Sequence, residues 1–280
     1  MASRIHRPPH SAQTPRGEVH FDSLERICNL VPSTGTESDW VLGDALACNA
    51  IELATPPPSV DLRENWWDVG DQENTGSSVG WATADGLLRY QFVKANRLSR
   101  GLRLSPRYVW MASKEADTSR HYPETFIEDS DTSLKAAVSL CKTYGVVTED
   151  LLPFHGGRTM YLGDESEFFT AASTRCAAHY FNMRRDQMQW KHWLANIGPV
   201  LVGLRVDATW DQVGHTGELN VFQPDTVRGG HAVTLVGYRE DGRFIVRNSW
   251  GAGWGDRGFA YAGSAYIEQA FFEESYGVTV

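Results

Sequence analysis

The sequence predicts an α+β protein in which most of the helices precede most of the strands. Four segments between residues 78 and 197 place apolar residues at helical spacing, whereas short apolar runs separated by turn residues follow from residue 199 onwards. Helices and strands that are separated along the chain are typical of α+β architectures, in which each kind of element builds its own region. With 280 residues, of which 41% are hydrophobic, the chain can bury a core of ordinary size as one domain or as two lobes.

The first predicted helix covers residues 78–94 and turns Val79, Leu87 and Tyr90 toward one buried side. Gly80 and Gly86 lower its intrinsic helix preference. Because Gly86 lies near the middle of an otherwise regular pattern, it predicts the close approach of a neighbouring element rather than a break in the helix.

The later helices are predicted from their capping residues. They are expected to begin at Ser105-Pro106, at Thr132 or Ser133, and near Asp186. Strands are expected at residues 199–206, 231–238, 243–246, 258–261 and 276–280.

The first 58 residues have a different character from the rest of the chain. Residues 1–17 are polar and indicate a flexible tail without the apolar segment of a secretory signal. Residues 18–58 form an N-terminal extension that ends in the stiff linker Ala54-Thr55-Pro56-Pro57-Pro58. Within this extension the spacing of Phe21, Leu24 and Ile27 favours a short helix. We expect the domain that carries the chemistry to span residues 59–280.

Charge and cysteine content exclude several classes of function. The net charge of −9 and the pI near 5.5 give no electrostatic footprint for nucleic acid, and no apolar run approaches the length of a membrane span. Four widely spaced cysteines form no CxxC pair, which argues against a zinc site or a disulfide framework and suits a reducing cytoplasm; they are Cys28, Cys48, Cys141 and Cys176. No metal or organic cofactor is expected.

Three short segments carry the chemical information. They are Asp71-Gln72-Glu73-Asn74-Thr75-Gly76-Ser77-Ser78, Gly229-Gly230-His231-Ala232-Val233 and Asn248-Ser249-Trp250-Gly251. In this order they resemble the active-site segments of papain-like cysteine peptidases, and Gly253-Trp254-Gly255 extends the match. Taken singly, each of these residues is more often structural than catalytic. The resemblance rests on their occurrence together, in the order and local sequence context of the family. It implies a helical lobe, about residues 59–180, packed against a β-rich lobe, about residues 181–280, with the active site between them.

The resemblance implies a role for each site residue. His231 is expected to be the general base and Asn248 to orient its ring, in the manner of a Cys-His-Asn triad. Gln72 and the backbone N–H of residue 78 are expected to stabilise the oxyanion. Trp250 is expected to shield the Asn248–His231 contact. Gly76 and Ser77 form the turn that leads into the helix.

One residue departs from the family pattern, because Ser78 stands where the family carries its catalytic cysteine. A hydroxyl cannot ionise beside a histidine as a thiol does, and a site spaced for sulfur places the smaller oxygen poorly. We therefore expect little or no peptidase activity from this chain. Three explanations stay open: a laboratory Cys→Ser substitution, a natural pseudopeptidase that binds peptides without cleaving them, and a serine-dependent acyl transferase.

The resemblance also bears on substrate binding and localisation. Ser130 and Asp131 lie where the family's substrate-pairing loop typically has glycines, and Gly230 before His231 indicates an open subsite. The expected partner is a peptide or protein substrate. Thr75 occupies the position at which secreted members usually carry a disulfide-bonded cysteine, which again favours the cytoplasm. Family zymogens block the cleft with an N-terminal segment, so two roles stay open for residues 18–58: they inhibit in this way, or they simply pack on the lobes. Their composition does not match the long helical prosegment of the secreted enzymes.

Overall fold

The computed structural model describes residues 26–48, 51–116, 131–155, 159–161 and 163–280. Its helices are α1 (Leu42–Ala47), α2 (Ser78–Trp81), α3 (Arg89–Lys94), α4 (Pro106–Ala116), α5 (Leu134–Thr143), α6 (Glu165–Ser173), α7 (Gln187–Asn196) and α8 (Ser264–Ala270). Its strands are β1 (Val60–Asp61), β2 (His179–Asn182), β3 (Val200–Val206), β4 (Glu218–Leu219), β5 (Gly229–Tyr238), β6 (Phe244–Arg247), β7 (Phe259–Ala262) and β8 (Phe271–Thr279).

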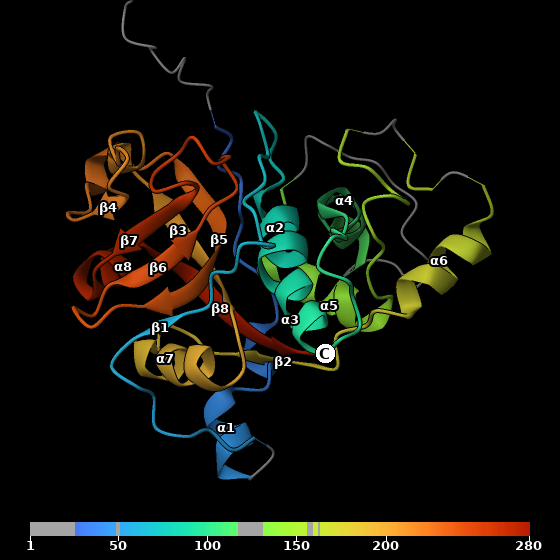
Figure 1. Ribbon diagram of the computed structural model, residues 1–280, viewed down its shortest axis with the longest axis horizontal. Helices are drawn as coiled ribbons and strands as arrows, with labels where there is room; N and C mark the ends of the chain where they lie inside the picture. The colour runs from blue at the N-terminus through green and yellow to red at the C-terminus, as the bar shows by residue number, and fades with distance from the viewer. Residues whose placement is uncertain (1–25, 49–50, 117–130, 156–158, 162) are drawn as a thin grey trace, which may run out of the picture.

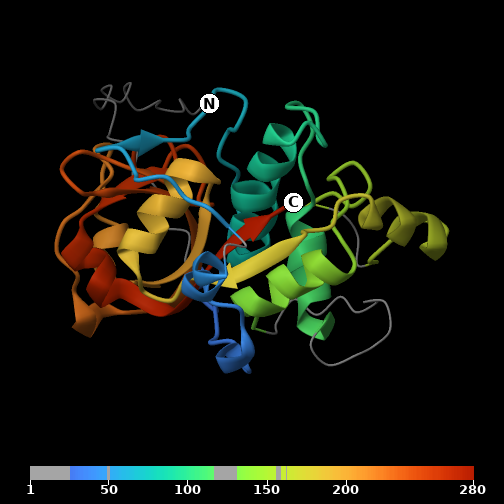
Figure 2. The same cartoon turned by 90° about the horizontal axis from the view of Figure 1, so that it is seen from below.

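A mixed sheet forms one side of the molecule and a group of helices forms the other (Figure 1). The strand order is β2-β8-β3-β5-β6-β7-β4, and β1 pairs with β5 outside this path. The β4–β7 pair is parallel, whereas the other pairs are antiparallel. The view from below shows the same two sides, with helix α7, in gold, next to the sheet (Figure 2). The α+β prediction is therefore confirmed.

One continuous helical stretch runs from Ser78 to Lys94, the bounds predicted from the sequence. Its middle part, Ala82–Leu88, is a π-helical segment, here called the π segment, which connects α2 to α3. The stretch is buried as far as Val93. It therefore forms the central helix of the molecule, and β5 packs against it.

Local capping explains where the next helices begin. The Ser133 hydroxyl accepts the N–H of Ala136 at the start of α5, and the Asp186 carboxylate accepts two N–H groups at the start of α7. Both caps are among the residues predicted for this purpose. Helices α1, α6 and α8, and strands β1, β2 and β4, were not predicted from the sequence pattern.

Two hydrophobic clusters account for most of the core. One joins α2, α4 and α5 to the inner face of the sheet, where Leu201 and Tyr276 take part. The other lies between the sheet and helices α7 and α8 and contains Trp190 and Trp193. Strand β1 also joins the sheet, although it lies within the range predicted for the helical lobe, because its backbone pairs with Tyr238 and Gly237 of β5. No helix in the described ranges is long and apolar enough to cross a membrane.

Candidate active site

Ser78 is the first residue of α2 and follows the N-cap residue Ser77. Both side chains are fully buried. The hydroxyl oxygen of Ser78 accepts the backbone N–H of Ala232 at 3.3 Å, which places it beside the residue that follows His231. As the first residue of a helix, Ser78 has a backbone N–H that no helical carbonyl can accept, and the positive end of the helix dipole lies at the same place.

His231 and Asn248 form a hydrogen-bonded pair on adjacent strands. His231 lies near the start of β5, and Asn248 follows the last residue of β6. The ring Nε2 of His231 and the side-chain Oδ1 of Asn248 are 2.8 Å apart. Because an amide oxygen only accepts, Nε2 carries the proton in this pair, and Nδ1 of the neutral ring keeps its lone pair. Nδ1 is buried and has no hydrogen-bond partner among the described residues.

Burial determines the protonation of this pair. The side chain of His231 is fully buried, and this burial lowers the pKa of His231 to about 4. The hydrogen bond to Asn248 acts in the opposite direction, while the charges of Arg26 and Arg228 lower the pKa further. In the structure as it stands, the imidazole is therefore neutral at pH 7.

Gln72 is held by two side-chain hydrogen bonds. Its Oε1 accepts the hydroxyl of Ser249 at 2.7 Å, and its Nε2 donates to the carbonyl of Thr75 at 2.8 Å. Its backbone N–H also donates to the carbonyl of Ser249 at 2.7 Å. Gln72 is thereby joined to the residue that follows Asn248. The hydroxyl of Ser249 is a site contact that was not predicted from the sequence.

Two tryptophans flank the ring of His231, and a third supports them. Trp250 lies with its ring centroid 5.1 Å from that of His231, and Trp210 lies 5.6 Å away at nearly a right angle. Trp254 stacks on Trp210 and donates its Nε1–H to the carbonyl of Trp210 at 2.8 Å. Trp210 was not predicted from the sequence, because it lies in a short 3₁₀ turn after β3 and belongs to no motif.

Of the residues predicted to bind substrate, Gly230 contacts the chain's own N-terminal segment. Residues 26–33, here called the strap, run between β5 and α2 (Figure 1). The N–H of Leu30 donates to the carbonyl of Gly230 at 3.0 Å, and the N–H of Val31 donates to the carbonyl of Thr132 at 3.3 Å. Asp131, next to Thr132, is exposed, whereas Ser130 lies outside the described residues.

The strap also covers the two glycines beside the predicted site. A side chain at Gly76 would lie 2.3 Å from the side chain of Asn29, and one at Gly229 would lie 2.3 Å from the carbonyl of Cys28. Leu30 is 3% exposed and belongs to the core cluster of the helical side. The strap therefore packs closely between the two sides.

Both ends of the strap are anchored by polar contacts. Arg26 forms an ion pair with Asp71 at 2.6 Å and donates to the carbonyl of Glu73 at 2.7 Å. Ser33 donates its N–H and its hydroxyl to the buried carboxylate of Glu274, at 3.1 and 2.7 Å. The short helix predicted around Phe21, Leu24 and Ile27 lies mostly outside the described residues. Ile27 itself is not helical, because the chain from Arg26 onwards follows the groove.

Two of the four cysteines do not carry a reactive thiol. Burial raises the pKa of the Cys141 thiol well above its ordinary value. Burial also raises the pKa of the Cys28 thiol in the strap to about 11. Both thiols are therefore protonated at neutral pH. The structure instead gathers Gln72, Ser78, His231, Asn248 and Trp250 into one region.

Comparison with known proteins identifies the family of the chain. The family model described as "Papain family cysteine protease" matches residues 56–274. The chain is 26% identical over 211 residues to the cathepsin L-like proteinase of Fasciola hepatica, covering 72% of this chain and 59% of that protein. It is 28% identical over 121 residues to cathepsin K of Mus musculus, covering 41% of this chain and 35% of that protein. The chain thus spans between about a third and three fifths of the length of these relatives.

Solved structures show the same architecture. Xylellain, a cysteine protease from Xylella fastidiosa, superposes with a TM-score of 0.71 at 20% sequence identity, covering 90% of this chain and 96% of that chain. Procathepsin L 3 of Tenebrio molitor superposes with a TM-score of 0.60 and covers 92% of this chain and 75% of that chain. The predicted papain-like architecture is therefore confirmed. With a family match that spans most of its length, this chain belongs to the papain family of cysteine proteases.

Proposed function

We propose that this chain has a papain-type site for peptide hydrolysis in which Ser78 occupies the position of the nucleophile. The observation that carries this proposal is the His231–Asn248 pair. One ring nitrogen of His231 is bonded to Asn248, while the other is buried and keeps its lone pair. The next residue, Ala232, contacts Ser78. This is the arrangement that an oriented general base requires.

The roles of the neighbouring groups follow from their chemistry. In a form with cysteine at position 78, His231 takes the thiol proton, and the thiolate attacks the substrate carbonyl. The carbonyl oxygen, as it becomes negative, receives the N–H of residue 78 and the carboxamide of Gln72. The Nε2 of Gln72 has two N–H groups, and the structure gives an acceptor for one of them. His231 then returns the proton to the leaving amine, and water releases the acyl group.

Serine at position 78 changes this sequence at its first step. The hydroxyl is not ionised at neutral pH, so His231 has to remove its proton during the attack itself. Its oxygen is also held by the N–H of Ala232. We therefore propose that the chain hydrolyses peptides slowly or not at all.

Peptide binding without cleavage is the second candidate, and the strap favours it. An extended stretch of this chain bonds through its backbone to both sides of the groove, at Gly230 and Thr132. A groove that holds an extended segment in this way is suited to hold an extended peptide. A native serine protein would then be a pseudopeptidase whose groove binds a peptide or a partner protein.

Hydrolysis of a fluorogenic peptide library by the protein and by its Ser78→Cys variant tests the proposal. We expect turnover to appear with Ser78→Cys and to be lost again in Ser78→Cys/His231→Gln. Turnover by the serine protein equal to that of Ser78→Cys would instead support serine-dependent acyl transfer. If Ser78→Cys hydrolyses no peptide while the serine protein binds peptides tightly, the binding function replaces the hydrolytic one.

A further inference from the structure

Two polar residues on the strands that carry His231 and Asn248 reach the helix that carries Ser78. Thr234 on β5 and Arg247 on β6 are paired directly across the sheet. Thr234 follows His231 by three positions, and Arg247 directly precedes Asn248. Any shift of these two residues is therefore transmitted to the His231–Asn248 pair through very short stretches of rigid strand.

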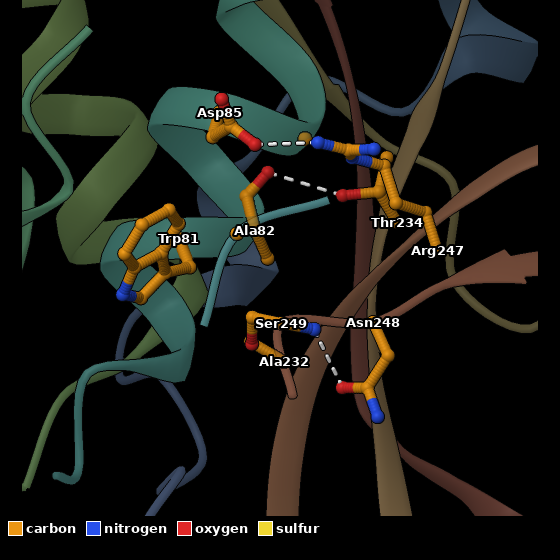
Figure 3. A pocket seen from close by; sticks show the side chains of 10 residues that line it. Trp81, Ala82, Asp85, Ala232, Thr234, Arg247, Asn248 and Ser249 are labelled. Carbon is orange, nitrogen blue, oxygen red and sulfur yellow. Dashed lines mark hydrogen bonds and ion pairs between the residues drawn. The ribbon is translucent and has the colours of Figure 1, made fainter. Parts of the chain in front are cut away.

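Both side chains bond to the π segment. The hydroxyl of Thr234 donates to the carbonyl of Ala82 at 3.1 Å. The guanidinium of Arg247 donates to the carboxylate of Asp85 at 2.5 Å. Figure 3 shows the two bonds side by side, joining the helix to the sheet. Ala82 lies about one helical turn after Ser78, so these bonds hold the part of the helix that sets the position of its first turn.

Gly86 makes the first of these bonds possible. A side-chain carbon at this position would lie 2.3 Å from the hydroxyl oxygen of Thr234. The predicted close neighbour of Gly86 is therefore confirmed as β5. The π-helical geometry interrupts the regular i→i−4 bonding of the helix, and in this segment the carbonyl of Ala82 also accepts the hydroxyl of Thr234.

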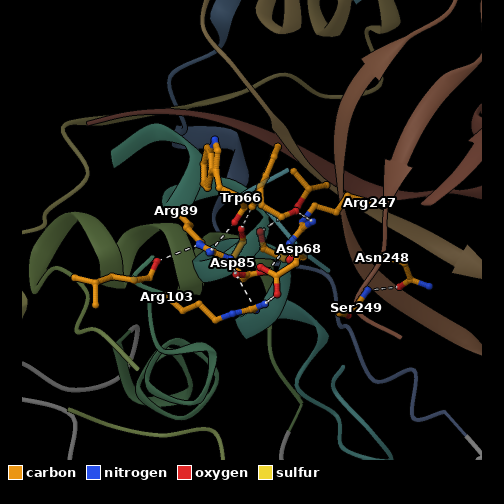
Figure 4. A network of polar contacts seen from close by, with 12 residues as sticks. Trp66, Asp68, Asp85, Arg89, Arg103, Arg247, Asn248 and Ser249 are labelled. Atoms are coloured by element: carbon orange, nitrogen blue, oxygen red, sulfur yellow. Dashed lines mark hydrogen bonds and ion pairs between the residues drawn. The ribbon is translucent and has the colours of Figure 1, made fainter. Parts of the chain in front are cut away.

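The second bond belongs to a larger rigid network (Figure 4). Arg247 also donates to the carbonyls of Trp67 and Asp68, at 2.9 and 2.7 Å. The carboxylate of Asp85 is shared with Arg89 at 3.0 Å and with Arg103 at 3.2 Å. Asp85 and Arg247 are both buried, so water competes little for their charges. Neither partner can move alone.

Packing alone does not set the separation between the helix and the two strands. A small cavity of about 10 Å³, room for one water molecule at most, lies between them. Its lining includes Asp85, Thr234, Arg247 and Asn248 (Figure 3). At this cavity the packing is incomplete, so the bonds of Thr234 and Arg247 contribute to the distance between the helix and the strands.

We propose that Thr234 and Arg247 are positioning residues that fix the distance between Ser78 and the His231–Asn248 pair. This inference rests on the proposed function. If it is right, replacing Thr234 or Arg247 changes the reactivity of the side chain at position 78 and not only the stability of the protein.

Alkylation of the Ser78→Cys protein by iodoacetamide, followed as a function of pH, tests the inference. Thr234→Val keeps the size of the side chain and removes the bond to Ala82. Arg247→Lys keeps the charge and removes the guanidinium that bonds to Asp85, Trp67 and Asp68. We expect each to slow alkylation near pH 6 by roughly 10- to 100-fold, the effect of a misplacement of up to about 1 Å. We also expect the pH profile to move toward that of an ordinary thiol, with a pKa of about 8.5.

Two matched controls separate positioning from stability. Thr83→Val removes a buried hydroxyl of the π segment that has no hydrogen-bond partner among the described residues. Arg239→Lys makes the same change of side chain at the residue that follows β5, where Arg239 forms an ion pair with Glu218. Each control is expected to leave the rate of alkylation, at every pH measured, within about 2-fold of the rate of the parent protein. A folded Thr234→Val or Arg247→Lys protein with the parent profile overturns the inference.

The thiol of Ser78→Cys could react like an ordinary cysteine, and this result would contradict the proposed function. A second measurement tests the positioning role in that case as well. The ¹⁵N resonances of the His231 ring are then compared in the serine protein. Thr234→Val is expected to move them and Thr83→Val to leave them in place. Unchanged resonances in Thr234→Val would overturn the inference independently of any activity.

Discussion

At the scale of single residues, His231 shows how burial prepares a side chain for its chemistry. Its ring is enclosed by Trp210 and Trp250, and its Nε2–H is bonded to Asn248. The enclosure lowers the pKa of His231 to about 4 because the charged imidazolium would lose its hydration. The ring is therefore kept neutral, with one nitrogen able to accept a proton.

This pKa predicts a pH dependence of stability. An unfolded chain binds a proton at His231 below about pH 6.5, whereas the folded chain does so only near pH 4. The unfolded state thus binds more protons between these values, and acidification from pH 6.5 to 4 lowers the free energy of unfolding. The stability that depends on the neutral ring of His231 is therefore fully present above about pH 6.5 and is lost as the pH falls toward 4.

Urea unfolding at several pH values checks this expectation. The protein should lose more stability between pH 6.5 and 4 than His231→Gln, whose side chain does not titrate. The difference between the two proteins isolates His231 from carboxylates that titrate in both. Parallel profiles for the two proteins would show that the buried ring is not what responds to acid.

The residues of the site were predicted as far as they belong to local motifs. Gln72, His231 and Asn248 stand in short segments whose order is informative, and the structure brings them together. Trp210 and Thr234 carry no local signal, because each acts through a contact with a residue distant in the chain. Sequence spacing alone does not show such contacts.

At the scale of elements, the helical stretch that begins at Ser78 combines a predictable and an unpredictable part. Its bounds, residues 78–94, follow from apolar spacing and were predicted. Its π segment was not, because this geometry depends on the contacts of Ala82 and Asp85 with the sheet. The helix propensity of the residues gives no information about a contact with another element.

Replacing Gly86 with alanine tests the importance of this close approach. Alanine favours a helix over glycine by about 1 kcal/mol, which on its own would stabilise the protein. The added carbon would displace the Thr234 hydroxyl, and overpacking of this kind typically costs about 1–3 kcal/mol. We expect the cost to exceed the gain, so that Gly86→Ala has a lower free energy of unfolding in urea.

Gly101→Ala is the matched control, because no described residue other than its two chain neighbours has an atom within 4 Å of the carbon that it would add. It is expected to unfold at the same or a slightly higher urea concentration than the parent. If Gly86→Ala were as stable as Gly101→Ala, the contact between Gly86 and Thr234 would not be a constraint.

At the scale of the whole molecule, an ion network and the strap are among the connections between the helical side and the sheet. The ion network around Asp85 connects them behind the site, and the strap connects them across it. The α+β class and the family were predicted from the sequence. The path of the strap was not, since a segment of mixed composition gives no periodicity from which its position in a groove can be read.

Displacing the strap should open the site. Leu30→Asp, made in the Ser78→Cys protein, places a charge where the leucine is buried. Burial of a leucine side chain contributes about 1.5–3 kcal/mol, so its loss shifts the equilibrium toward the open state by roughly 10- to 100-fold. We expect labelling of the thiol at position 78 by a bulky peptide-based electrophile to accelerate accordingly.

Ile27→Asp supplies the control from the same segment. Because Ile27 is 43% exposed, an aspartate at this position keeps its charge in contact with water. Its effect on labelling should be much smaller. Equal labelling of Leu30→Asp and of the protein with an intact strap would show that the strap does not restrict the groove.

The central claim is that position 78 and His231 form a reactive pair, and the pKa of a thiol at position 78 tests it most directly. In Ser78→Cys, alkylation by iodoacetamide should persist well below the pKa of an ordinary cysteine, which is about 8.5, because His231 accepts the proton. The reactivity at low pH should disappear in Ser78→Cys/His231→Gln. A thiol at position 78 that reacts only near pH ~8.5 and above, with or without His231, would contradict the account.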